Sequence, residues 1–216
     1  MKILALDCAN DNCSAALFRD GAVVGRDFRQ LSRGQAEVLM GLIDGVLRQA
    51  REEYAALDAI GVTVGPGSFT GVRIGLATAR GLGLAANLPV VGVSALNVAG
   101  HLSASLHPDK KVCIFFDTKR SDYYAQLFFN GTPCGEPFAG GAEVLTALNA
   151  DVYAGNCPDM FFEQTGKKAD LLKMPDASDV ALFIAAKHRS EIRKKPPYEY
   201  PSALYLREAE ISTCAK

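Results

Sequence analysis

The chain has 216 residues, of which 49% are hydrophobic, and 23 lysines and arginines face 24 aspartates and glutamates. This near balance argues against avid electrostatic binding of nucleic acid by the chain alone. No uncharged run of about 18 apolar residues is present, so no membrane-spanning helix is predicted. The six cysteines are scattered without a C-x-x-C pair, and the start reads as a strand and not as a signal peptide, which together predict a reducing, cytoplasmic location.

Hydrophobic patterning predicts that strands and helices alternate in the first half of the chain. Strands are expected at 2–6, 14–18 and 23–28, and the turn at 19–21 joins the last two as a hairpin. A helix follows at 35–50, then a strand at 59–64, a helix at 70–86, a strand at 89–93 and a helix at 95–106. A hairpin that leads into strand–helix–strand crossovers predicts an α/β layer architecture.

A second region is expected to begin near residue 107. Strands are predicted at 112–117 and 123–129 around a polar connection, followed by a short helix at 142–148 and a short strand at 151–154. The last predicted helix covers 178–188, with Ser178 as its N-cap, and prolines keep 195–201 extended. We therefore predict two domains, at 1–106 and 107–216.

The most unusual stretch is GPGSFTGVRIG at 65–75, a glycine-rich junction between a predicted strand and a predicted helix. Such junctions often bind phosphate, because free backbone N–H groups and the helix dipole both favour an anion. No lysine follows the glycines, however, and Thr70 stands where the third glycine of G-x-G-x-x-G would be, so both nucleotide-binding patterns fail. Ser68 is interpreted as a residue that starts the helix.

Small residues continue through the predicted helix at every fourth position, namely Gly71, Gly75, Ala79 and Gly83. A glycine within a helix costs about 1 kcal/mol relative to alanine, so three of them need compensation. Three explanations are open at this point: a tight contact between this helix and its own sheet, a surface for a partner helix, or an anion site.

Five segments together resemble the TsaB (YeaZ) family: LALDCANDNCSAALF, GPGSFTGVRIGLATARGLGLA, VVGVSALNVAGHL, DTKRSDYYAQLF and SALYLR. The resemblance implies the actin-like/Hsp70-like ATPase (ASKHA) fold, with two RNase H-like subdomains. It also implies a role in making threonylcarbamoyladenosine at position 37 of tRNAs that read codons beginning with A. In that pathway the catalytic paralogue is TsaD, and the ATPase TsaE joins the pair.

The resemblance further implies a non-catalytic subunit. The paralogues carry a metal-binding H-x-x-x-H, but here Asn97 precedes His101 where the first histidine should be. The connection at 118–122 also lacks the glycines of the paralogues' phosphate loop. No catalytic or metal-binding residue is therefore predicted. Asp7, at the end of the first strand, is interpreted as a polar strand-end residue or a weak nucleotide contact.

The interface with the TsaD-like subunit is predicted on two helices, where homodimers of the chain alone would also form. Contact with tRNA is expected only through the complex, no membrane contact is expected, and no cofactor is expected to be tightly bound, although ATP or ADP at the shared interface fits. Two other functions stay open: a nucleotide-dependent enzyme of the same fold, or a general regulatory binding protein. The predicted interface residues are Val38, Leu39, Leu42, Gly71, Arg73, Gly75, Ala79 and Gly83.

Overall fold

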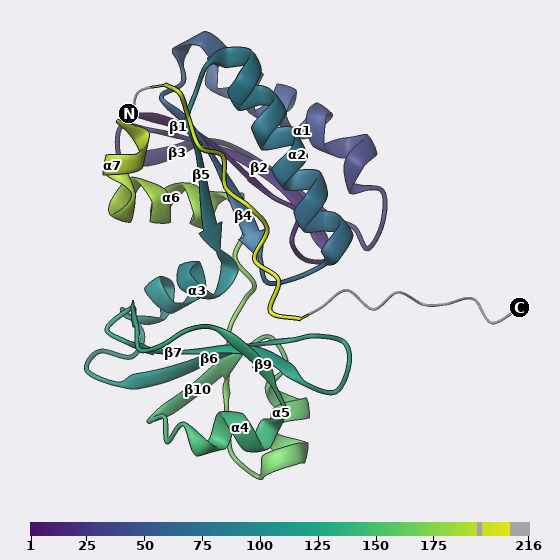
Figure 1. Cartoon of the computed structure of the whole chain (residues 1–216), viewed down its shortest axis with the longest axis vertical. Coiled ribbons are helices and arrows are strands. Elements are labelled where there is room, and N and C mark those ends of the chain that lie inside the picture. The colour runs from purple at the N-terminus through teal and green to yellow at the C-terminus, as the bar shows by residue number, and fades with distance from the viewer. Residues whose placement is uncertain (194–195, 208–216) are drawn as a thin grey trace, which may run out of the picture.

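The computed structural model describes residues 1–193 and 196–207. The chain folds into two lobes, each built around its own β-sheet (Figure 1), which confirms the predicted α/β class. Within the described residues, no helix is long and apolar enough to cross a membrane.

The sheet of the first lobe has the strand order β3-β2-β1-β4-β5. β1, β2 and β3 form an antiparallel meander, as the predicted hairpin requires, whereas β4 and β5 run parallel to β1. Each strand lies within two residues of its predicted bounds. The five strands are β1 (Lys2–Asp7), β2 (Asn12–Arg19), β3 (Ala22–Gln30), β4 (Ala59–Gly65) and β5 (Val90–Ser94).

Helices cover both faces of this sheet (Figure 1). α1 (Gln35–Ala50) and α2 (Phe69–Ala86) pack on one face, where the core includes Leu4 and Leu6 of β1. Successive side chains of a strand point to opposite faces, so Ile3 and Ala5 face the other side. There they pack against α6 (Ala177–Lys187).

The sheet of the second lobe has the order β11-β10-β6-β7-β8, and β9 also pairs with β7. α4 (Ala142–Ala147) and α5 (Pro158–Thr165) cover one face, around Phe115, Tyr123 and Phe161. α3 (Ala95–Ser103) covers the other face and lies between the lobes. The remaining elements are β6 (Lys111–Asp117), β7 (Tyr123–Phe129), β8 (Thr132–Pro133), β9 (Phe138–Gly140), β10 (Val152–Gly155), β11 (Asp170–Leu171), α7 (Arg189–Ile192) and the 3₁₀ turn η1 (Tyr54–Ala56).

The predicted second domain at 107–216 is wrong in its last part, because α6 returns to the first sheet. Val180 and Ile184 of α6 are fully buried in the same core as Ile3. Gly61 of β4 makes room for this contact, since a Cβ there would lie 2.5 Å from the Ile184 side chain. The chain crosses back to the first lobe just before α6, and residues 208–216 lie outside the described part.

The predicted N-cap of α6 is also wrong. Asp176 caps the helix and not Ser178, because the Asp176 carboxylate accepts a hydrogen bond from the Ser178 amide (2.8 Å). Asp179 completes a capping box by accepting one from the Asp176 amide (3.0 Å). The Asp176 carboxylate also accepts hydrogen bonds from Arg26 (2.7 Å) and Lys173 (3.0 Å). This residue therefore joins α6 to β3 and to the segment that leaves the second lobe.

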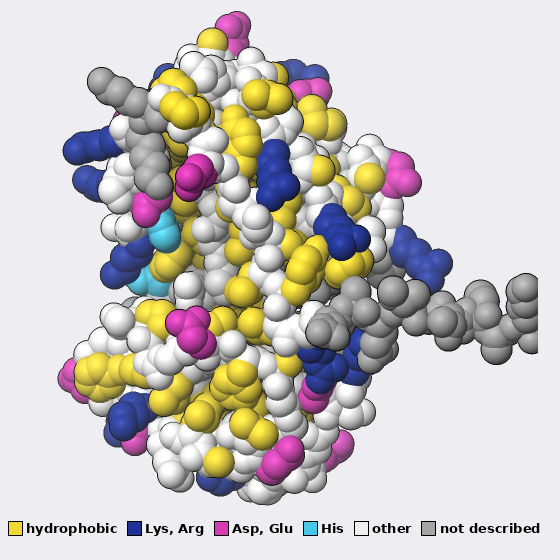
Figure 2. Space-filling view, viewed as in Figure 1, with side chains coloured by type: hydrophobic (Ala, Val, Ile, Leu, Met, Phe, Trp, Pro, Cys, Tyr) yellow, Lys and Arg dark blue, Asp and Glu magenta, His cyan; other side chains and the backbone are white. Residues whose placement is uncertain are grey.

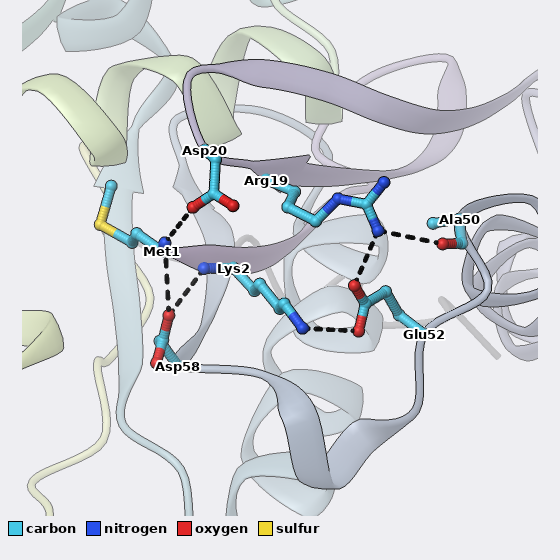
Figure 3. Close-up of polar contacts among 7 residues, drawn as sticks. All are labelled: Met1, Lys2, Arg19, Asp20, Ala50, Glu52 and Asp58. Atoms are coloured by element: carbon cyan, nitrogen blue, oxygen red, sulfur yellow. Dashed lines mark hydrogen bonds and ion pairs between the residues drawn. The ribbon is translucent and has the colours of Figure 1, made fainter.

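Glu52, just after α1, fastens that helix to the sheet (Figure 3). Its carboxylate accepts hydrogen bonds from Lys2 of β1 (2.9 Å) and from Arg19 of β2 (2.8 Å). Arg19 also donates to the carbonyl of Ala50, the last residue of α1 (3.3 Å). The two cationic partners lower the pKa of Glu52 below its usual value. This polar network fixes the C-terminal end of α1 to β1 and β2, beside the β2–β3 turn.

Candidate functional site: the glycine junction and the cleft between the lobes

The glycine junction packs against the turn that follows β1. A Cβ at Gly67 would lie 2.0 Å from the carbonyl oxygen of Ala9, and one at Gly71 would lie 1.9 Å from that of Cys8. The Ser68 amide donates to the Ala9 carbonyl (2.6 Å). The Gly71 amide donates to the Ser68 hydroxyl (3.2 Å), which confirms Ser68 as the residue that starts the helix. Both amides are thus occupied within the chain, which does not favour the anion-site explanation.

The small residues of α2 form an internal contact with the sheet and its flanking segments. Gly71, Gly75, Ala79 and Gly83 are all buried. A Cβ at Gly83 would lie 2.5 Å from the side chain of Val90 on β5. The first of the three explanations is therefore confirmed, and the prediction that these four residues form a partner interface is wrong. Their lack of side chains lets α2 lie close to its own sheet.

The other predicted interface residues divide into two groups. Leu39 and Leu42 are only 1% and 4% exposed and belong to the core beneath α1, so they too are wrong as interface residues. Val38 is half-buried and Arg73 is exposed. For these two side chains the prediction stands untested.

The exposed side of α2 carries a second series of small residues, which the sequence analysis missed. Ala77, Gly81 and Ala85 recur at every fourth position and are exposed, so they share one face of the helix. A Cβ at Gly81 would meet nothing within 4 Å. In the sequence both series have the same spacing. The two series differ only in which of them faces the sheet, and the sequence spacing does not show this.

Asp7 lies beneath the first turn of α6 and is 1% exposed. One carboxyl oxygen accepts a hydrogen bond from the Ala9 amide (3.3 Å), and the other, Oδ2, has no partner. Burial raises the pKa of this carboxyl to about 6, and the nearby carboxylates of Asp176 and Asp179 add to the effect. Because Asp7 does not line the cleft described below, its position does not support the predicted contact with a nucleotide.

A cleft of about 730 Å³ separates the lobes. Its walls come from the β1–β2 turn, the glycine junction, the β6–β7 loop and the segment at 204–207. Lys119 of the second lobe pairs with Asp11 of the first across this cleft. Among the residues that line it are Asn10, Asp11, Asn12, Phe28, Ser68, Phe69, Asp117, Lys119, Arg120, Tyr124, Asn156, Lys173, Tyr205 and Arg207.

The segment at 201–207 forms a strap along the first lobe, and it explains the late SALYLR motif. The Leu204 amide donates to the carbonyl of Val64 (2.8 Å). Two arginines of α2 hold the strap: Arg80 donates to the Pro201 carbonyl (3.0 Å) and Arg73 to the Tyr205 hydroxyl (2.8 Å). At the end of the strap an ion pair joins Arg207 to Asp122 of the second lobe, so the strap reaches both sides of the cleft.

The sequence and structure comparisons with known proteins point to the same family. TsaB of Escherichia coli is 34% identical over 57% of this chain and 53% of its own length. The structure of YeaZ from Pseudomonas aeruginosa is 25% identical, with a TM-score of 0.72 over 87% of this chain and 93% of that one. The chain belongs to the TsaB (YeaZ) family. An uncharacterised protein of Mycobacterium tuberculosis is 38% identical over 71% of each chain.

The chain spans about half the length of the curated TsaB relatives that it matches. Those relatives are tRNA threonylcarbamoyladenosine biosynthesis proteins. A family described as TsaD, tRNA N6-adenosine threonylcarbamoyltransferase, also matches residues 29–133. A hexokinase from Thermus thermophilus is 14% identical with a TM-score of 0.51 over 86% of this chain and 98% of its own, a likeness that concerns the fold alone and agrees with the predicted actin-like architecture.

The residues that match the TsaD family include His101. The His101 ring lies 5.4 Å from that of Phe183 on α6, in an edge-on arrangement. Partial burial lowers the pKa of His101, and the charge of Lys187 lowers it further. Among the residues that the structure describes, no three His, Cys, Asp or Glu side chains are grouped so that they could hold a metal ion.

Proposed function

We propose that this TsaB-family chain is a non-catalytic subunit of the machinery that makes N6-threonylcarbamoyladenosine in tRNA. In this proposal it pairs with a TsaD-type catalytic subunit, and a TsaE-type ATPase joins them. The observation that carries the proposal is the family itself, whose curated members are tRNA threonylcarbamoyladenosine biosynthesis proteins. The TsaD match over 29–133 supports a common ancestor for this chain and its proposed TsaD-type partner.

The environment of His101 supports the non-catalytic role. The residue one helical turn earlier is Asn97, so the two side chains that share this face are an amide and an imidazole instead of two imidazoles. The His101 ring contacts Phe183 of α6. This contact gives the histidine a packing role within the chain.

We place the partner surface on the exposed sides of α1 and α2. Ala77, Gly81 and Ala85 leave α2 flat there, so another helix can approach closely. On α1, Gly41 also has open space around its Cα, and the apolar side chain of Met40 beside it is 44% exposed. A subunit of the same fold would offer equivalent helices, and a second copy of this chain would compete for the same surface. ATP or ADP at this shared interface is part of the same proposal.

We expect Gly81→Leu to abolish copurification with the TsaD-type subunit while the chain stays folded. A leucine at this exposed position projects into open space in the isolated chain but would separate two closely packed helices. Size-exclusion chromatography of the mixed subunits measures the complex, and circular dichroism measures the fold. Gly81→Ala is the matched control, because it adds one methyl group and should keep the complex. Survival of the complex with Gly81→Leu would refute this placement.

A further inference from the structure

The cleft between the lobes gathers positive charge in a chain whose net charge is −1. Its lining includes four cationic side chains and two carboxylates, and Figure 2 shows lysine and arginine side chains at the waist between the lobes. Two of the cations, Lys119 and Lys173, are 66% and 70% exposed. Asp11, the partner of Lys119, is also 49% exposed, so this ion pair is weak and an incoming phosphate can replace its carboxylate. The lining charges are Lys119, Arg120, Lys173 and Arg207 against Asp11 and Asp117.

Two aromatic rings lie at the mouth of this cleft. Phe69 and Tyr205 are 40% and 45% exposed, and their ring centroids are 5.2 Å apart. The guanidinium carbon of Arg73 lies 3.5 Å from the Phe69 ring centroid. Exposed aromatic faces beside a guanidinium plane are the groups on which unstacked bases pack in complexes with single-stranded nucleic acid.

Unpartnered carboxamide groups line the same cleft. Asn12 is 6% exposed, and its Oδ1 has no hydrogen-bond partner. The Nδ2 of the nearby Asn10 is also buried without a partner. A buried polar atom without a partner is destabilising until a ligand or water satisfies it. The edge of a nucleobase offers both donors and acceptors that would satisfy these two groups.

We propose that the cleft binds a short segment of single-stranded RNA, with a base at the Asn10–Asn12 turn or on the Phe69–Tyr205 pair and phosphates near Lys119 and Arg207. The ligand chemistry is a nucleotide unit, and the choice of RNA over a free nucleotide rests partly on the proposed function. It also rests on the β6–β7 loop, which has no glycine-lined cradle for a polyphosphate. The cleft volume is within the range of ordinary ligand sites.

The first test uses the full chain and a fluorescein-labelled single-stranded oligoribonucleotide, with fluorescence anisotropy at 50 to about 200 mM salt. We expect binding that weakens with salt. The double variant Lys119→Ala/Arg207→Ala should bind at least about tenfold more weakly. Its salt slope should be smaller by about 1.4, because each lost phosphate contact on a single strand removes about 0.7. The control Lys110→Ala/Lys168→Ala removes two exposed lysines that lie outside the cleft lining, and it should bind within about twofold of the original chain.

A second pair of variants separates stacking from charge. Tyr205→Phe keeps the ring and removes only the hydroxyl that accepts from Arg73, so it should bind RNA more tightly than Tyr205→Ala does. Tyr205→Ala removes the ring and should weaken binding by about tenfold, the typical effect of losing one stacked base. Circular dichroism checks that each variant is folded.

Three results would overturn the cleft proposal: no binding at 50 mM salt, equal losses in the cleft and control double variants, or displacement of the RNA by AMP, ATP or inorganic phosphate at equal nucleotide concentration. The last would make the cleft a site for a free nucleotide or anion. These measurements use the isolated chain, whereas the Gly81→Leu test measures pairing. Loss of RNA binding with intact pairing would therefore refute the cleft proposal and leave the proposed function standing.

Discussion

Replacing Gly71 with alanine is expected to destabilise the first lobe by about 3 kcal/mol or more. The added Cβ would lie 1.9 Å from the carbonyl oxygen of Cys8. Neither this carbonyl nor the Gly71 Cα that carries the Cβ can move away without shifting the backbone that follows β1 or that of α2. Overpacking of a tight core costs about 1–3 kcal/mol even where side chains can adjust. Urea unfolding followed by circular dichroism measures the loss.

Gly81→Ala, in the same helix, is the control for this prediction. It restricts the backbone of the unfolded chain in the same way as Gly71→Ala does. Its methyl group, however, meets nothing within 4 Å. We therefore expect this variant to be more stable than the original chain by up to about 1 kcal/mol. If both alanine variants changed stability by the same amount and sign, the close approach of α2 to the β1–β2 turn would be contradicted.

Asp7→Asn is expected to stabilise the protein above pH 6, by about 3 kcal/mol. Burial raises the pKa of this carboxyl from 3.8 to about 6, so the folded state binds its proton more tightly than the unfolded state does. The stability that this group contributes is present in full below about pH 3.8 and falls as the pH rises through 6. An asparagine keeps the shape and removes the buried charge, and each pKa unit corresponds to about 1.4 kcal/mol.

The measurement is the free energy of unfolding at several pH values between about 4 and 8. The difference between Asp7→Asn and the original chain should grow across this range and level off above pH 6. The exposed substitution Asp159→Asn serves as the matched control and should show no such trend. A constant difference across the range would contradict the raised pKa of Asp7.

The sequence predicted most of the elements of the first lobe because its apolar residues keep a clear period. α1 was predicted with its observed bounds, and its buried stripe has the period of an amphipathic helix. α5 was missed, because it is only eight residues long and Phe161 is its one buried residue. The N-cap of α6 was assigned two residues late, since Ser178 and Asp176 are both residue types that favour this position.

Long-range relations could not be predicted in this way. The return of α6 to the first sheet follows from the contact of Ile184 with Gly61, which are far apart in the chain. For the same reason the spacing of small residues in α2 indicated a close contact but not its side. The cleft is lined by many segments that are far apart in the chain, so its lining residues share no pattern in the sequence. Only Ser68 could be assigned a local role from its neighbours.

The two sides of α2 connect the fold to the proposed function. The inner side, with Gly71 and Gly83, fixes the helix against the sheet. The outer side, with Gly81, is left open for the subunit that we propose as partner, and Arg73 and Arg80 hold the strap that borders the cleft. The proposed partner surface and the proposed RNA contact are therefore connected through the same helix, α2.

Reconstitution of tRNA threonylcarbamoylation with purified TsaD-type and TsaE-type subunits tests the central claim most directly. Modified tRNA should form when this chain is added, should fail to form with its Gly81→Leu variant, and should form normally with Gly81→Ala. Modification that proceeds equally well without the chain, or that the chain carries out alone, would contradict its role as a non-catalytic partner.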